Sequence, residues 1–398
     1  MRFCIVVPDG AADLPVAKLD GRTPLEVART PNLDRAAAEG LLGVTDNVPP
    51  RMLPGSEIAM MSVAGYDPAQ YYTGRGPLEA ADLGLDLGPH DWAIRCNLVT
   101  VAEDVIVDFT AGHISTEEAG ALIGALNGSL GGPQLSFHVG TSYRHVTVYR
   151  GDQPLTAETA APHDVVGLPV ADNYPRGEGS EMLIDLMERS RPILASHDVN
   201  HVRRDLGRNP ATMIWLWGQG KKPDLPGFES RFGVKGAVIS AVNLVRGIGR
   251  LIGWEVVKVP GATGYVDTDY AAKGRYAVGA LGSAGLVLVH VEAPDEASHE
   301  RDLMAKVRAI ERVDRDIVGP LMAYADSERD VRLLVVPDHL TSVEDGKHKR
   351  GKVPFAIWGA GVEAVSEYRF TEAHAEASET EVANGWQLMS ELIGSGMA

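Results

Sequence analysis

Three hydrophobic segments of this 398-residue sequence end in an aspartate. They read Val-Val-Pro-Asp9, Val-Glu-Ala-Pro-Asp295 and Val-Val-Pro-Asp338. Because ligands bind outside the carboxyl ends of the strands in an open parallel sheet, three such strands would bring their carboxylates together. Packed carboxylates repel one another, and a divalent cation between them removes the repulsion. A single aspartate after a strand is more often a turn or cap residue, so the hypothesis depends on the coincidence of all three.

Three histidines accompany these aspartates. His299 lies four residues after Asp295, a spacing that places both side chains on one face of a helical turn. His339 directly follows Asp338, and His348 lies nine residues later. Each pair alone is typical of a surface contact. Together, carboxylates and imidazoles are the ligand mixture of a transition-metal or mixed Mn, Zn or Mg site, and the set is large enough for two ions.

Ser56, in the segment Pro-Gly-Ser-Glu, is a candidate nucleophile. It stands just before a predicted helix at Ile58–Val63, and a helix N-terminus favours both an alkoxide and an incoming phosphoryl group. The alternative is an N-cap serine followed by Glu57 in the first turn, where acidic residues are favoured. The two roles are compatible if a metal ion lies in front of the helix.

Hydrophobic segments rich in Val, Ile and Leu alternate with helical patterns along much of the chain. This alternation indicates an α/β protein with a doubly wound, mostly parallel sheet. Strands are predicted at Phe3–Val7, Leu286–Val291 and Val331–Val336. Helices are predicted at Glu26–Glu39, Ile58–Val63, Ala237–Ile252, Tyr270–Leu281 and Asp302–Ala323.

The middle of the chain has a pattern of its own. Strands are predicted at Trp92–Val101, Val105–Phe109 and His145–Tyr149, with a helix at Ser115–Leu126 between them. Segments rich in Pro and Gly, at 87–91 and 221–228, flank this region. We therefore expect a discontinuous catalytic domain over residues 1–87 and 227–398, with a smaller α/β domain inserted over residues 88–226.

Composition narrows the range of partners. The sequence has 37 Lys and Arg against 54 Asp and Glu, a net charge of −17, which argues against nucleic acid and anionic membranes as partners. Two cysteines are too few for a disulfide framework and favour a cytoplasmic location. No P-loop motif is present, and no Gly-x-Ser-x-Gly elbow surrounds Ser56.

Stretches from residue 1 to about residue 361, nearly the whole chain, resemble the archaeal-type cofactor-independent phosphoglycerate mutases, and more closely a bacterial branch of that family. Some members of this branch carry a proposed homoserine kinase label. The informative stretches include VVPDG, LPGSEIAMMSVAGYDP, YYTGRGPLEAA, RCNLVTV, AGHIST, YRH, VKGAVIS, VHVEAPDEASHE and VVPDH. The resemblance implies an alkaline-phosphatase-like fold, because the family belongs to that superfamily of metalloenzymes.

The resemblance also implies an isomerase of glycolysis and gluconeogenesis, which interconverts 3-phosphoglycerate and 2-phosphoglycerate through a phosphoserine at Ser56. It implies two divalent metal ions, Mn²⁺ first and Mg²⁺, Zn²⁺ or Co²⁺ as alternatives, with no 2,3-bisphosphoglycerate. One ion is assigned to Asp9, Ser56, Asp338 and His339, and the other to Asp295, His299 and His348. Substrate contacts are assigned to His113, Arg144, Arg203 and Arg204 of the inserted domain and to Lys235, which would approach the phosphoryl group.

Alternative functions use the same residues. An ATP-dependent homoserine kinase would use the same metals and serine with a different donor. A phosphomonoester hydrolase would release phosphate from the phosphoserine. A non-catalytic relative that only binds a metabolite is disfavoured by the intact Ser56 and carboxylates.

Overall fold

The computed structural model describes residues 1–364 and 368–394, which divide into two compact units. Unit 1 comprises Met1–Tyr72 and Leu225–Ala398, and unit 2 comprises Thr73–Asp224. The first boundary lies at Tyr72 rather than at the expected residue 87. The difference arises because helix α5 (Arg75–Asp82) packs on the strands of unit 2.

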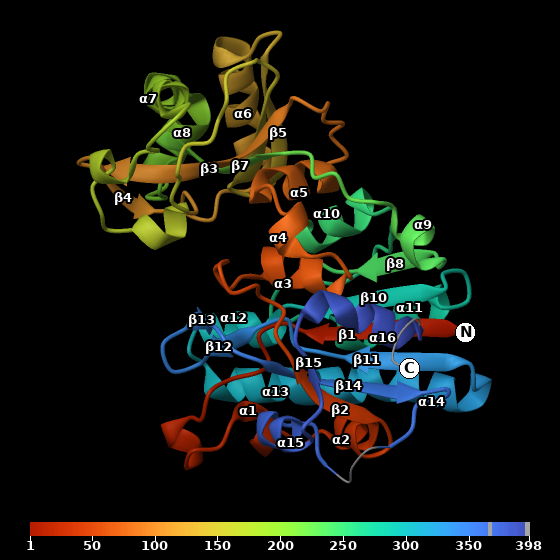
Figure 1. Cartoon of the computed structure of the whole chain (residues 1–398). Helices are drawn as coiled ribbons and strands as arrows, with labels where there is room; N and C mark the ends of the chain where they lie inside the picture. Colours follow the sequence, from red (N-terminus) through yellow and green to blue (C-terminus); the bar gives the residue numbers. More distant parts are fainter. Residues whose placement is uncertain (365–367, 395–398) are drawn as a thin grey trace. The chain divides into compact units, whose positions relative to one another are not determined.

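Unit 1 is built on a mixed, mostly parallel sheet of eight strands in the order β15-β2-β14-β11-β1-β10-β8-β9 (Figure 1). The central strand β1 pairs in parallel with β10 and β11, and β8 pairs in parallel with β10. Strands β14 and β2 run antiparallel to their neighbours β11 and β14. The predicted α/β fold with a mostly parallel sheet is confirmed. The strands are β1 (Arg2–Pro8), β2 (Leu41–Thr45), β8 (Gly236–Ile239), β9 (Glu255–Val256), β10 (Leu286–Val291), β11 (Val331–Val335), β14 (Val353–Gly359) and β15 (Glu381–Val382).

The central strands β1 and β10 are buried along nearly their whole length. Residues 4–7 of β1 are fully inaccessible to solvent, and so are most residues of β10. A strand covered on both faces carries a continuous apolar run instead of an alternating one. This continuous apolar pattern explains why these strands could be predicted from the sequence.

The helices of unit 1 differ from the prediction in three places. The segment predicted as one helix over Glu26–Glu39 forms two helices, because extended backbone at Ala28 and the proline at residue 31 interrupt it. The segment predicted as helical over Ala237–Ile252 begins with strand β8. A π-helical turn at Asp314–Val318 divides the last predicted helix. The helices are α1 (Pro24–Val27), α2 (Pro31–Ala38), α3 (Ser56–Val63), α4 (Pro68–Tyr71), α9 (Phe228–Phe232), α10 (Asn243–Leu251), α11 (Tyr270–Ala280), α12 (Ala293–His299), α13 (Leu303–Val313), α14 (Gly319–Glu328), α15 (Glu372–Ala377) and α16 (Leu388–Ile393).

Unit 2 contains a five-stranded antiparallel sheet in which β3 pairs with β4, β6 and β7, and β5 pairs with β6. Alternate residues of β3, including Ile94 and Cys96, face a hydrophobic core shared with helices α6 and α7. The opposite face of the sheet is packed by α5. The elements are β3 (Trp92–Ala102), β4 (Val105–Asp108), β5 (Leu135–Thr141), β6 (Arg144–Tyr149), β7 (Met213–Lys221), α6 (Thr116–Leu130), α7 (Ser180–Ala195) and α8 (Asp198–Asp205).

Both cysteines are free thiols buried inside the units, Cys4 in β1 and Cys96 in β3. A capping box forms at the start of α6, since the Ser115 hydroxyl accepts a hydrogen bond from Glu118 N at 3.2 Å. Across residues 1–364 and 368–394, no helix has the length and apolar character needed to span a membrane.

Candidate metal centre

The carboxyl ends of β1, β10 and β11 bring the three predicted aspartates together. Asp9 follows β1, Asp295 lies in the first turn of α12, directly after β10, and Asp338 follows β11; all three are buried. Gly10 adopts φ +60°, and a Cβ atom there would lie 2.4 Å from Asp295 Oδ1. Its backbone N–H donates to Asp338 Oδ1 at 3.0 Å. A glycine is therefore required for the close approach of these strand ends.

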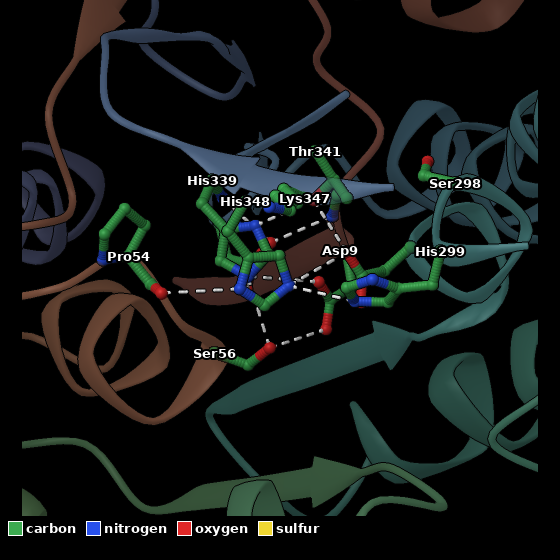
Figure 2. Close-up of polar contacts among 12 residues, drawn as sticks. Asp9, Pro54, Ser56, Ser298, His299, His339, Thr341, Lys347 and His348 are labelled. Atoms are coloured by element: carbon green, nitrogen blue, oxygen red, sulfur yellow. Dashed lines mark hydrogen bonds and ion pairs between the residues drawn. The ribbon is translucent and has the colours of Figure 1, made fainter. Parts of the chain in front are cut away.

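Ser56 begins helix α3, and its hydroxyl points at this cluster (Figure 2). Ser56 Oγ donates to Asp9 Oδ2 at 3.3 Å and lies 3.3 Å from His339 Nε2. The N-cap position is occupied by Gly55, and no side chain caps the helix. The interpretation of Ser56 as an N-cap serine is therefore wrong, and its oxygen is directed at the carboxylates.

Asp295, His299 and His348 form one compact ligand group. His299 Nε2 lies 3.0 Å from Asp295 Oδ2 and 3.1 Å from His348 Nε2, and His348 Nε2 lies 3.5 Å from Asp295 Oδ1. His348 comes from β13 (Lys347–Lys349), which forms a hairpin with β12 (Leu340–Ser342). One ligand atom from each residue lies within 4.8 Å of the others, close enough to hold one ion.

His339 connects Asp9 and Asp338 beside Ser56. Its Nε2 lies 3.2 Å from Asp338 Oδ2 and 3.7 Å from Asp9 Oδ1. Both of these carboxylate oxygens are buried, and neither accepts a hydrogen bond from any described residue. Because a buried carboxylate oxygen without a partner is costly, this donor set fits a divalent cation.

The pKa values of the residues in this centre are shifted by burial and by the close packing of charged groups. Burial and the neighbouring carboxylates of Asp338 and Asp295 raise the pKa of Asp9. Burial also opposes the ionisation of Asp295, but hydrogen bonds from His299 and His348 hold its pKa well below the usual range. The hydrogen bond to Asp295 raises the pKa of His299 to about 9. Protons on imidazoles thus balance the carboxylates in the chain alone, and divalent ions can replace those protons.

Sequence reasoning missed His290 of β10. Its Nε2 lies 2.8 Å from Asp9 Oδ2, and its Nδ1 lies 3.1 Å from Ser240 Oγ. Complete burial lowers the pKa of His290 to about 3, so the ring is neutral. A histidine inside an apolar strand, next to the strand that ends in Asp9, was the signal available in the sequence.

A buried ion pair below the centre was also missed. Lys306 Nζ donates to Asp13 Oδ2 at 2.7 Å and to Thr341 O at 2.7 Å. The Thr341 hydroxyl in turn donates to Asp295 Oδ1 at 2.6 Å. These contacts tie the segment after Asp338 to α13 and to the loop after β1.

Lys235 lies away from the centre. It precedes β8, whose first residue Gly236 pairs with Leu286, the first residue of β10. The length of β10, roughly 20 Å, therefore separates it from the strand ends that carry the aspartates. The expectation that Lys235 approaches the phosphoryl group is wrong. The buried lysine close to the centre is Lys273 of α11, which donates to His290 O at 3.2 Å and whose pKa burial lowers to about 8.

Arg203 of unit 2 is buried, and its guanidinium is used inside the unit. It donates to Ala111 O at 2.7 Å, to Gly112 O at 3.1 Å and to Glu118 Oε2 at 2.9 Å. These acceptors lie on either side of His113, which has φ +49° and is exposed. This placement favours a role for Arg203 in positioning the His113 loop.

The remaining candidates of unit 2 are exposed. Arg144 lies at the start of β6, with its guanidinium 5.1 Å from the centre of the Tyr143 ring. Arg204 lies in α8 and donates to Ala195 O at a long 3.4 Å. Both arginines are therefore accessible from solvent, unlike Arg203.

Known proteins match the whole chain. The family model described as 2,3-bisphosphoglycerate-independent phosphoglycerate mutase matches residues 37–200. A mutase of this description from Methanothrix thermoacetophila is 45% identical over 99% of this chain and 100% of its own length. One from Methanothermobacter thermautotrophicus is 49% identical, with 92% and 90% covered.

Two solved structures share the fold along the same length. A protein from Pyrococcus horikoshii matches with a TM-score of 0.82 and 29% identity, over 100% of this chain and 98% of that one. The cofactor-independent phosphoglycerate mutase of Thermoplasma acidophilum matches with a TM-score of 0.67 and 29% identity, over 99% of both chains. With sequence, fold and length in agreement, the chain belongs to the 2,3-bisphosphoglycerate-independent phosphoglycerate mutase family.

Proposed function

We propose that this chain interconverts 3-phosphoglycerate and 2-phosphoglycerate by way of a phosphoserine at Ser56. The observation that carries the proposal is the position of Ser56 Oγ, 3.3 Å from both Asp9 Oδ2 and His339 Nε2 and outside the N-cap position of α3. Family membership supports the reaction, and this geometry supports the serine as its nucleophile.

The buried carboxylates, together with the imidazoles of His299, His339 and His348, fit two divalent ions, with Mn²⁺ as the first candidate. Asp9, Ser56, Asp338 and His339 would hold one ion, and Asp295, His299 and His348 would hold the other. When bound, such ions lower the pKa of a hydroxyl ligand and neutralise phosphoryl oxygens.

The chain's own groups supply the nucleophile and a favourable environment for the phosphoryl group. The N-terminus of α3 favours negative charge at Ser56 Oγ and attracts the incoming phosphoryl group. Ser56 Oγ gives up its proton and attacks phosphorus, the P–O bond to glycerate breaks, and the departing glycerate oxygen takes up that proton. The 2-hydroxyl of the same glycerate then loses its proton and attacks the phosphoserine, the P–O bond to Ser56 breaks, and the Ser56 oxygen takes up this proton. Two in-line displacements give overall retention of configuration at phosphorus.

A mutase differs from a hydrolase in keeping glycerate while the phosphoserine persists. We assign this task to unit 2, with the exposed His113, Arg144 and Arg204 as candidate contacts and Arg203 as the support of the His113 loop. Excluding water from the phosphoserine would prevent its hydrolysis. The two buried free thiols agree with a reducing cytoplasm, where this reaction would serve glycolysis and gluconeogenesis.

The test is detection of the phosphoserine. The Mn²⁺-loaded chain is mixed with 3-phosphoglycerate and quenched in acid, and peptides are analysed by mass spectrometry. We expect a phosphate on Ser56, and we expect Ser56→Ala to lose both this signal and 2-phosphoglycerate formation. Ser283→Ala, at an exposed serine of the same unit, is the matched control. Turnover by Ser56→Ala at the control's rate would refute the covalent step.

The same preparation separates the alternative functions. 3-Phosphoglycerate coupled to enolase reports mutase activity, ATP with homoserine reports kinase activity, and free phosphate reports hydrolysis. We expect the first signal to dominate.

A further inference from the structure

Thr341 of β12 lies between the two groups of residues to which the ions are assigned. Its hydroxyl donates to Asp295 Oδ1 at 2.6 Å and lies 3.1 Å from His339 Nδ1 (Figure 2). The side chain is completely buried, and its hydroxyl is packed against Gly10, where a Cβ atom would lie 2.7 Å from Thr341 Oγ1. One buried hydroxyl group therefore contacts one residue from each of the two groups.

The backbone of Thr341 is held on both sides. Its N–H donates to Ala12 O at 3.1 Å, and its carbonyl accepts from Lys306 Nζ at 2.7 Å. In the hairpin of β12 and β13, Thr341 pairs with His348, so their side chains lie on the same face. The strand pairing and the buried lysine therefore fix the position of the hydroxyl.

The two contacts of the hydroxyl determine which ring nitrogen of His339 carries hydrogen. A threonine hydroxyl has one proton to donate. In the 2.6 Å contact this proton is directed at Asp295, because a carboxylate can only accept. The hydroxyl oxygen is then left to accept, so His339 Nδ1 is the donor of the 3.1 Å contact.

The other ring nitrogen of His339, Nε2, then presents a lone pair to the centre. It lies 3.2 Å from Asp338 Oδ2 and 3.7 Å from Asp9 Oδ1, two buried oxygens that accept no hydrogen bond from any described residue. A lone pair beside two carboxylate oxygens is unfavourable until a cation lies among them. The tautomer selected by Thr341 is thus the one in which His339 can serve as a ligand.

We propose that Thr341 is a positioning residue for both ions of the centre. Its hydroxyl fixes the His339 tautomer for one ion and orients the Asp295 carboxylate for the other. The inference rests on the two-ion centre of the proposed function. It predicts that loss of this single hydroxyl weakens both ion sites, because each site then loses the group that orients one of its ligands.

Each ion site is measured by itself in the full chain. Asp338→Asn removes a residue of the first group, and His299→Ala removes a residue of the second. Chelator-treated protein of each background, with and without Thr341→Val, is titrated with Mn²⁺ by calorimetry. Valine keeps the shape of threonine and removes the hydroxyl. We expect Thr341→Val to weaken Mn²⁺ binding by about tenfold or more in both backgrounds. Weakening in only one background would overturn the proposal that Thr341 serves both ions.

Two further variants separate the hydroxyl from its surroundings. Thr341→Ser keeps a hydroxyl and should restore most of the Mn²⁺ affinity. Thr45 of β2 is equally buried, and its hydroxyl donates to Val382 O at 2.8 Å. Thr45→Val therefore removes a buried hydrogen bond of the same unit and should leave Mn²⁺ affinity unchanged. Equal Mn²⁺ affinities of the Thr341→Val and Thr45→Val proteins would overturn the proposal.

A purely structural role of the hydroxyl is distinguished by the His339 ring itself. Such a role predicts a lower melting temperature for Thr341→Val without a change in the ring. Nuclear magnetic resonance of Zn²⁺-loaded protein labelled with ¹⁵N-histidine reports the ring proton, since Zn²⁺ is diamagnetic. We expect a proton on Nδ1 that exchanges slowly with solvent in wild type and in Thr341→Ser, and exchanges rapidly in Thr341→Val.

The wild-type spectrum decides the matter even if Thr341→Val does not fold. A His339 ring proton on Nε2 instead of Nδ1 would overturn the assignment. Wild-type protein that binds fewer than two Mn²⁺ ions would overturn the two-ion centre, and this inference with it. Two ions bound with equal affinity by wild type and Thr341→Val would overturn the role of Thr341 alone and leave the proposed function intact.

Discussion

His290 Nε2 lies 2.8 Å from Asp9 Oδ2, and both side chains are completely buried. The contact follows from the register of the sheet, in which Val7 of β1 pairs with His290 of β10 and Asp9 follows two residues later. Ser240 Oγ lies 3.1 Å from the other ring nitrogen of His290 and fixes the ring. The neutral His290 imidazole is fixed by Ser240 and therefore orients the Asp9 carboxylate, which accepts the hydrogen bond from Ser56.

We therefore expect His290→Ala to weaken Mn²⁺ binding by roughly 10- to 100-fold, the usual cost of removing a group that orients a metal ligand. Activity at saturating Mn²⁺ should recover in large part, because Asp9 itself is still present. Titration of chelator-treated protein with Mn²⁺, followed by activity, measures the shift. His90→Gln, at an exposed histidine of unit 2, is the control. Unchanged Mn²⁺ affinity in His290→Ala would remove the orienting role.

The residues of the metal centre that could be predicted from the sequence have their positions in common. Asp9, Asp295 and Asp338 each end or follow a continuous apolar strand, and the carboxyl ends of parallel strands meet at one edge of a sheet. His299 and His339 were predicted because they lie close in sequence to two of these aspartates. The sequence can therefore predict those site residues that lie at strand ends or close to such residues in sequence.

The rest depends on packing that the sequence does not encode locally. Lys235 stands in a matching motif but at the amino end of its strand, which becomes apparent only from its pairing register. The sequence predicts that Arg203 binds a ligand, and only its burial against Glu118 and Ala111 reveals its contacts inside the unit. The sequence also predicts strand β8 as part of a helix, because its four apolar residues directly precede a helical pattern.

The buried Lys306–Asp13 pair should be important for stability. Replacing Lys306 by Met leaves the Asp13 carboxylate buried without its cation, which costs about 3–5 kcal/mol in free energy of unfolding. Denaturant unfolding followed by circular dichroism measures this change. Lys352→Met, which removes the exposed pair with Glu381, should cost about 0–1 kcal/mol. If the two substitutions cost the same, the buried pair does not stabilise the segment after Asp338.

Stability should depend on pH through Glu372. Burial raises the pKa of this carboxyl from 4.5 to about 7, against hydrogen bonds from Asp13 N and the Thr23 hydroxyl. The folded protein therefore binds this proton more tightly than the unfolded chain does. Its contribution to stability is present below about pH 4.5 and is lost as the pH rises through about 7.

We accordingly expect the melting temperature of Glu372→Gln, relative to wild type, to rise between pH 5 and pH 8. The glutamine cannot ionise, so it avoids the cost that the carboxylate meets as the pH increases. Thermal unfolding at several pH values checks this, with Glu376→Gln at an exposed position of α15 as the control. A constant difference in melting temperature across this range would contradict the assigned burial effect.

Removal of divalent ions should affect both activity and stability. Chelator treatment is expected to abolish mutase activity and to lower the melting temperature, because the buried carboxylates then repel one another and must take up protons. Added Mn²⁺ should restore both in a concentration-dependent manner. The loss of stability should be smaller in Asp338→Asn, since this variant has one buried charge fewer to compensate. Full activity after chelation would exclude the metal centre as the site of the reaction.

Gly10 offers the most direct test of how tightly the strand ends converge. Gly10→Ala places a Cβ atom 2.4 Å from Asp295 Oδ1 and 2.7 Å from Thr341 Oγ1, so Asp295 has to move away from Asp9. Gly21 shares the positive φ, at +80°, but a Cβ there meets no atom within 4 Å. Gly21→Ala therefore carries the same backbone cost, about 1 kcal/mol, without the clash. We expect Gly10→Ala to lose Mn²⁺ affinity and activity while Gly21→Ala keeps both, as measured by Mn²⁺ titration and coupled assay. Equal activities would mean that the centre tolerates a displaced Asp295, and the two predicted ion sites would then not depend on this spacing.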